Sequence, residues 1–151
     1  MKDLRVSDFP LSARLLASAV LVFFTGAHVF ALWLSRNVGE AAGSAQAHFA
    51  YKELIYLLRM SHQHLFGHGT MYFLTGALFL LTDAREKIKI VLPLLPFMGA
   101  ALDLASWWML KYGTYDCEWL SILGGTLFTG SFLAMVLVLL RDLWKPRAKQ
   151  G

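Results

Sequence analysis

Four long apolar stretches constrain what this chain can fold into. Residues 15–34, 61–82, 90–110 and 119–140 together contain a single acidic residue, Asp103, and no lysine or arginine. Each stretch has the roughly 20 residues that a helix needs to cross about 30 Å of hydrocarbon. Backbone groups in lipid must bond within their own segment, so each stretch predicts a transmembrane helix.

The composition agrees with a membrane protein. Of the 151 residues, 57% are hydrophobic and only 16% are charged, whereas a soluble domain carries about 25% charged residues. Short connections between the stretches favour an all-α, up-and-down antiparallel four-helix bundle. We therefore expect residues 1–151 to form a single integral membrane domain in contact with the lipid bilayer.

The longest connection lies between the first two spans, at residues 35–60. Its first part, residues 39–44, is rich in small residues and is expected to be flexible. Residues 45–59 contain good helix formers without proline or glycine, which predicts a helix outside the membrane. Ser44 stands where it could cap that helix.

The basic residues give the bundle a direction. Lysine and arginine concentrate in the N-terminal segment, the loop between spans two and three, and the C-terminal tail: Lys2, Arg5, Arg14, Arg85, Lys87, Lys89, Arg141, Lys145, Arg147 and Lys149. Such residues favour the cytoplasmic side. Both termini are therefore predicted to be cytoplasmic, in what we expect to be a bacterial inner membrane. Because these residues flank apolar runs, the net charge of +4 does not indicate nucleic-acid binding.

The single cysteine, Cys117, excludes an intrachain disulfide and any cysteine-rich metal site. A free thiol is expected, and pairing with another chain stays open. The proline pair Pro93 and Pro96 predicts a kink near the cytoplasmic end of the third span.

Three ionisable residues from three spans fall at one depth. His28 lies eight residues from Arg36, His68 nine from Arg59, and Asp103 eight from Lys111. At 1.5 Å per residue, each lies about 12–14 Å inside its flanking charge. Ionisable groups at such depth are costly and usually face the bundle interior, where they mark function. All five histidines lie toward the outer side or outside the membrane.

The second span carries a polar stripe. His64 and His68 are four residues apart and share a helix face, which Ser61, Tyr72 and Thr75 extend. His62 is expected to point elsewhere on this helix, and His48 lies in the external segment.

Three hypotheses compete for these residues. The first is a haem b held by His28 and His68, with His64 nearby and with cations such as Arg59 beside the haem propionates. The second is a mononuclear copper, zinc or iron site formed by His28, His64, His68 and Asp103. The third is a cofactor-free accessory or assembly subunit in which the histidines bond across helices.

A short resemblance favours haem. Residues 68–73, which read His68-Gly69-Thr70-Met71-Tyr72-Phe73, resemble the helix of haem-copper oxidase subunit I that ligates the low-spin haem. The resemblance implies that His68 is an axial ligand. The chain has four expected spans rather than about twelve and lacks that family's second histidine cluster, so oxygen reduction is not implied. It also lacks the inner-half histidines of four-helix di-haem cytochromes.

The leading expectation is therefore an electron carrier, or a subunit of a respiratory complex, rather than a stand-alone enzyme. Its cofactor would lie near the outer, periplasmic leaflet, where electrons can be exchanged with quinol or with a periplasmic partner. A larger membrane complex or a homo-oligomer would suit this role.

Overall fold

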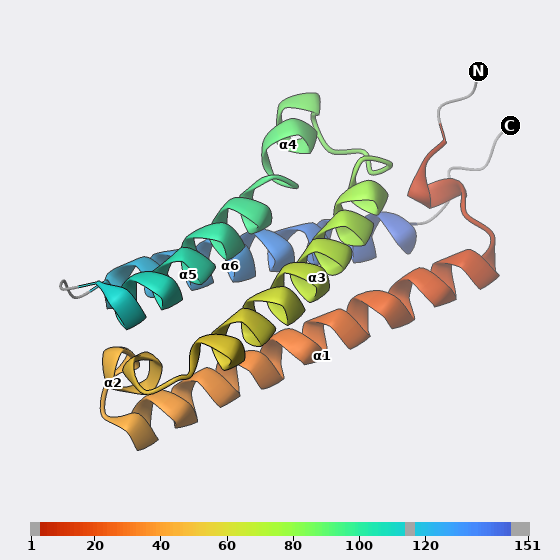
Figure 1. Ribbon diagram of the computed structural model, residues 1–151. Coiled ribbons are helices and arrows are strands. Elements are labelled where there is room, and N and C mark those ends of the chain that lie inside the picture. The colour runs from red at the N-terminus through yellow and green to blue at the C-terminus, as the bar shows by residue number, and fades with distance from the viewer. Residues whose placement is uncertain (1–3, 114–116, 146–151) are drawn as a thin grey trace, which may run out of the picture.

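The computed structural model describes residues 4–113 and 117–145, and for residues 38–42 only the backbone. Every regular element in these ranges is helical (Figure 1). In chain order the elements are the 3-10 turn η1 (Val6–Asp8) and the helices α1 (Leu11–Ala42), α2 (Ala45–Ala50), α3 (Leu54–Phe79), α4 (Glu86–Val91), α5 (Leu95–Tyr112) and α6 (Glu118–Leu143). The predicted all-α class is confirmed.

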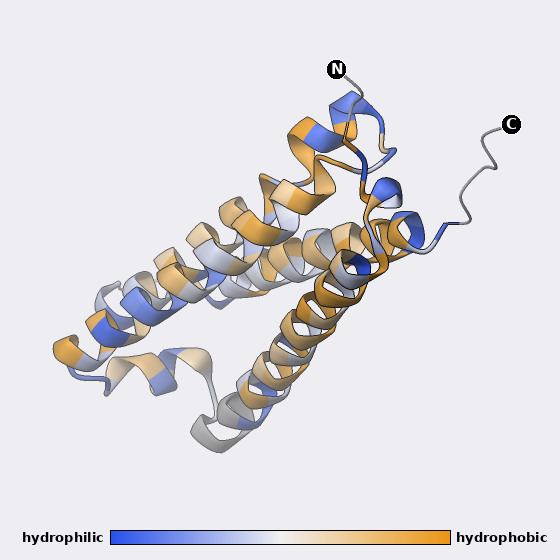
Figure 2. Cartoon of the chain, turned by 90° about the vertical axis from the view of Figure 1, so that its right-hand side faces the viewer, coloured by the Kyte–Doolittle hydropathy of each residue, from blue (hydrophilic) through white to orange (hydrophobic). Residues whose placement is uncertain are grey.

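Three helical segments of the described chain are long and apolar enough to cross a membrane. They are Leu11–Asn37, Glu86–Tyr112 and Glu118–Leu143, and they coincide with the first, third and fourth expected spans. Figure 2 shows hydrophobic residues along most of their length. Helix α3, where the second span was expected, is 26 residues long. Its polar side chains make it less apolar than the other three.

The proline kink is confirmed. The third apolar segment divides at Leu92–Leu94 into α4 and α5, and Pro96 lies in the first turn of α5. Proline has no amide hydrogen to give to the preceding turn, so a helix either starts or breaks there.

The connection between α1 and α3 differs from expectation. Residues 39–42, expected to be flexible, continue α1 as helix, which ends only before Gly43. Gly43 has φ +78, the left-handed conformation that glycine adopts readily after a helix. The Ser44 cap is confirmed, since its side chain accepts a hydrogen bond from the amide of Ala47 at 3.0 Å. The helix expected at 45–59 is split, because residues 51–53 separate α2 from α3.

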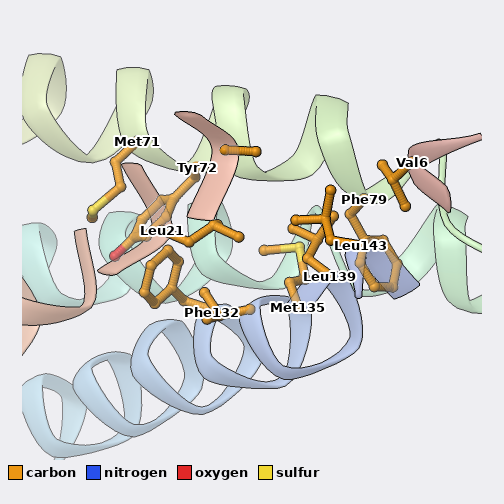
Figure 3. Packing of buried hydrophobic residues seen from close by; sticks show 11 residues of the cluster. Val6, Leu21, Met71, Tyr72, Phe79, Phe132, Met135, Leu139 and Leu143 are labelled. Atoms are coloured by element: carbon orange, nitrogen blue, oxygen red, sulfur yellow. The ribbon is translucent and has the colours of Figure 1, made fainter. Parts of the chain in front are cut away.

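The main hydrophobic core lies between α1, α3 and α6 (Figure 3). Its largest fully buried members include Tyr72 and Phe79 of α3 and Phe132 of α6. The buried residues of this cluster are Val6, Ala17, Leu21, Met71, Tyr72, Phe79, Phe132, Met135, Val136, Leu139 and Leu143.

A second, smaller cluster lies at the opposite end of the helices, under α2. Phe49 of α2 stacks on Trp107 of α5 with 5.5 Å between ring centroids. Leu57, Leu110 and Cys117 complete the buried set. Helix α2 therefore covers this end of the structure, and the Cys117 thiol is buried beneath it.

Helices α5 and α6 approach closely through two glycines. A Cβ added to Gly124 would lie 2.6 Å from the backbone nitrogen of Asp103, and one on Gly99 would lie 2.6 Å from that of Phe128. Small residues in span four were expected to allow such packing. The structure assigns the contact to Gly124, because Gly125 and Gly130 face open space.

These two surroundings predict opposite effects for adjacent substitutions. Gly124→Ala forces backbone against backbone and should lower the free energy of unfolding by about 1–3 kcal/mol. Gly125→Ala meets no neighbour and should change it by no more than about 0.5 kcal/mol. Thermal unfolding of both variants in detergent measures the difference. Equal loss in both would contradict the described packing of α5 on α6.

Candidate functional site

The polar stripe of α3 faces the interior. Ser61 is 7% exposed, Tyr72 0% and Thr75 1%. His64 and His68, on the same face, are half-buried. Their surroundings come from helices distant in sequence, namely α1, α5 and α6. The predicted common layer can therefore be examined residue by residue.

His28 of α1 is the most enclosed histidine and has partners for both ring nitrogens. It is 5% exposed, and its ring stacks on Phe132 of α6 with 4.2 Å between centroids. Nδ1 lies 3.2 Å from the carbonyl oxygen of Phe24, and the Tyr72 hydroxyl lies 3.4 Å from Nε2. If Nδ1 carries the proton, Nε2 accepts from Tyr72.

His64 and His68 form a pair on α3. Their rings are perpendicular, with centroids 5.4 Å apart. Nδ1 of His64 lies 2.9 Å from the carbonyl oxygen of Met60, so a proton there leaves Nε2 with a free lone pair. His68 has only ring contacts, with His64, Tyr72 and Phe128. Within the described chain, no hydrogen bond is formed by the His68 ring.

Asp103 of α5 is half-buried and bonded to the neighbouring helix. The Ser121 hydroxyl of α6 donates a short hydrogen bond to its carboxylate. Ser106, a partner considered from the sequence, instead donates to the backbone carbonyl of Asp103 at 2.6 Å. Thr25, another considered partner, donates to the carbonyl of Leu21.

A cavity of about 80 Å³ lies between α3 and α5. Its polar lining comes from His64, His68, Tyr72 and Asp103, and Trp107 closes part of it. The remaining walls are apolar, so the four polar groups face a space with few other hydrogen-bonding partners.

The structure brings together part of the predicted site. His64, His68 and Asp103 line one cavity, while His28 lies outside that lining and reaches it only through Tyr72. Arg59 is exposed, so it is not part of this interior cluster.

The two remaining histidines lie apart from the cavity lining. His62 is exposed, as expected. His48 on α2 packs against Phe49. Burial, and then the nearby charge of Lys52, lower the pKa of His48, which favours its neutral form near pH 7.

Two interior contacts were missed from the sequence. Trp107 was assigned to the outer interface by its position near a helix end, yet it is 8% exposed and lies 4.7 Å from His64 between ring centroids. Ser121 precedes Gly124 by one helical turn, which places it on the face that packs against α5. That spacing was the available signal for its bond to Asp103.

A haem between His28 and His68 does not fit this conformation. Tyr72 stands between them, with its hydroxyl at His28 and its ring stacked on His68 at 5.3 Å. Cofactor pockets have volumes of about 300–1,000 Å³, and the cavity beside His68 has about 80 Å³.

A single metal ion fits better, although the site is incomplete. In the described ranges, no three His, Cys, Asp or Glu residues form a ready metal site. The pair His64 and His68 supplies two ligands. Imidazoles sharing one ion at about 2.0 Å per bond have ring centres about 5 Å apart, close to the observed 5.4 Å.

Comparison with known proteins identifies a family. The model of a family described as a transmembrane helical domain matches residues 40–150. The chain therefore belongs to this family and is an integral membrane protein. Neither the curated proteins nor the solved structures include a match to the chain.

The contact between His28 and Tyr72 gives a stability prediction. Tyr72→Phe leaves Nε2 of a buried imidazole without its donor and should lower the free energy of unfolding by about 1–3 kcal/mol. Tyr51→Phe is the control, because Tyr51 is 89% exposed. Chemical unfolding in detergent measures both variants. An unchanged Tyr72→Phe would mean that this hydrogen bond contributes nothing.

Proposed function

We propose that the protein crosses the bacterial inner membrane four times, with both termini in the cytoplasm. Helix α3 would be the fourth span, arranged with the other three as an antiparallel bundle. Its 26 residues are as many as those of α6. Its inward-facing polar residues account for its lower hydropathy, because polar groups within a membrane bundle face the interior.

Reporter fusions test this topology. If α3 crosses, Tyr51 and Lys87 lie on opposite sides of the membrane, and Lys87 and Lys145 lie on the same side. Alkaline phosphatase, which is active only outside the cytoplasm, should be active when fused after Tyr51 and inactive after Lys87 or Lys145. Equal activity after Tyr51 and Lys87 would show that α3 does not cross.

We further propose that the protein binds one copper or iron ion through His64 and His68. The observation that carries this proposal is the histidine pair lining a cavity with Asp103 opposite. Imidazole and carboxylate ligands suit both metals. Zinc is a poorer choice for electron transfer, because it has no redox chemistry.

The surroundings of the pair favour metal binding over a purely structural role. The bond between Nδ1 of His64 and the Met60 carbonyl is the kind that orients a metal-ligating imidazole. The ring nitrogens of His68 have no hydrogen-bond partner among the described residues, so an ion would satisfy a group that is otherwise desolvated. Asp103, held by Ser121, would supply charge compensation across the cavity.

The proposed role is electron transfer at the outer leaflet, as a carrier or as a subunit of a larger respiratory complex. In the proposed topology the cavity lies in the outer half of the membrane. A periplasmic protein or a quinol would then be the exchange partner. Phe49 of α2 covers Trp107, which itself contacts His64. Exchange would therefore pass this aromatic cover.

Haem b is the second candidate, and His28 is the observation that favours it. Its Nδ1 also lies against the carbonyl of the preceding turn, and its Nε2 is directed toward α3. Binding a haem between His28 and His68 would require Tyr72 to leave its position. This rearrangement makes haem the less supported of the two.

Metal analysis of the purified full-length protein tests the ion site. Wild type and His62→Ala should carry stoichiometric copper or iron, and His64→Ala or His68→Ala should lose it. Asp103→Asn should weaken binding about 10–100-fold if the carboxylate orients a ligand. His62 is the matched control, since it lies exposed on the same helix.

Absorption spectra of the same preparations separate the candidates. A Soret band that disappears in both His28→Ala and His68→Ala would replace the ion with haem. Protein that contains neither metal nor haem, and that gains no metal on addition of copper or iron salts, would overturn both.

A further inference from the structure

A second cavity, of about 400 Å³, lies at the end of the structure away from α2. Its walls are the segment before η1 and the connection from α3 to α4, including Leu4, Arg5, Asp83 and Lys89. Figure 1 shows these segments near the end of α6.

Several bonds hold this cavity in shape. The amide of Val6 donates to the carbonyl of Leu81 at 3.0 Å, which ties the N-terminal segment to the connection. The amide of Asp83 donates at 2.9 Å to the carboxylate of Asp142, a residue only 1% exposed. Arg141 pairs with that buried carboxylate at 2.7 Å. The cavity is therefore built from fixed backbone rather than from a loose surface loop.

The charges around the cavity leave one cation uncompensated. Asp83 is the acidic group in the lining, and it already pairs with Arg5 at 2.9 Å and with Lys145 at 3.4 Å. Lys89 is half-buried in the same lining, and in residues 4–113 and 117–145 it forms no ion pair. Neighbouring Lys87 is exposed and lies outside the lining. A partly buried ammonium without a counter-ion favours an anionic ligand.

The position of the cavity indicates where that anion comes from. Leu4, Leu80 and Leu81 form apolar walls beside the charged groups. The cavity lies where α3 ends and α4 begins, so in a membrane it stands at the boundary between hydrocarbon and water. Basic pockets at this level, with apolar surface beside them, suit the headgroup and the first acyl carbons of an anionic lipid.

We propose that this cavity binds the phosphate of an anionic phospholipid, with Lys89 as its principal cation and Arg5 beside it. The acyl chains would leave along the leucine wall. This proposal is independent of the metal site, which lies at the other end of α3.

Native mass spectrometry tests the proposal on the full-length protein in detergent. Phosphatidylglycerol and phosphatidylcholine are titrated separately into wild type and variants. We expect phosphatidylglycerol to bind wild type more tightly than phosphatidylcholine does. Lys89→Gln should weaken phosphatidylglycerol binding about fivefold, the effect of one lysine near a lipid phosphate. Lys87→Gln, the matched control, should leave it unchanged.

Further arms separate the alternatives. Lys89→Arg should retain binding because it keeps the charge, and circular dichroism checks that Lys89→Gln is folded. Equal losses in Lys89→Gln and Lys87→Gln would overturn the site in favour of general attraction to a basic surface. Inorganic phosphate competing as strongly as the lipid would replace a lipid with a free phosphate. No preference for phosphatidylglycerol in wild type would overturn the proposal entirely.

Discussion

The fold depends on the polar face of α3 being covered. Exposure of Ser61, Tyr72 and Thr75 to lipid would leave their hydroxyl groups without water, at a cost of several kcal/mol for each unpaired group. All three are buried instead, against α1, α5 and α6. Trp108 donates to Ser61 at 3.1 Å, and Tyr72 reaches His28. The position of α3 thus brings histidines from two helices toward one carboxylate.

The contact between α5 and α6 makes this arrangement specific. Gly99 and Gly124 let the two backbones approach, and the approach brings Ser121 within hydrogen-bond reach of Asp103. The carboxylate is thereby held at the edge of the α3–α5 cavity, where it faces His64 and His68. A bulkier residue at position 124 would disturb the proposed ion site as well as the packing of the helices.

Hydropathy and charge predicted the long helices well, because length, apolarity and the proline break are local properties of the chain. The shared depth of His68 and Asp103 also led to a common cavity, since rise per residue is constant in a helix. Rotation about the helix axis was not predictable in the same way. It turned Trp107 inward and gave His28 its own partners, Tyr72 and Phe132. Small residues at 39–42 were read as flexible, although alanine-containing sequence readily continues a helix.

X-ray absorption at the edge of the bound metal tests the proposed ion site most directly, because it reports the ligands around the metal. For full-length protein in detergent, we predict copper or iron with imidazole nitrogens from His64 and His68 and with oxygen ligands, and loss of the imidazole signal in His68→Ala. A planar set of four equatorial nitrogens, as a porphyrin supplies, would contradict the ion site. An unchanged imidazole signal in His68→Ala would place the metal elsewhere.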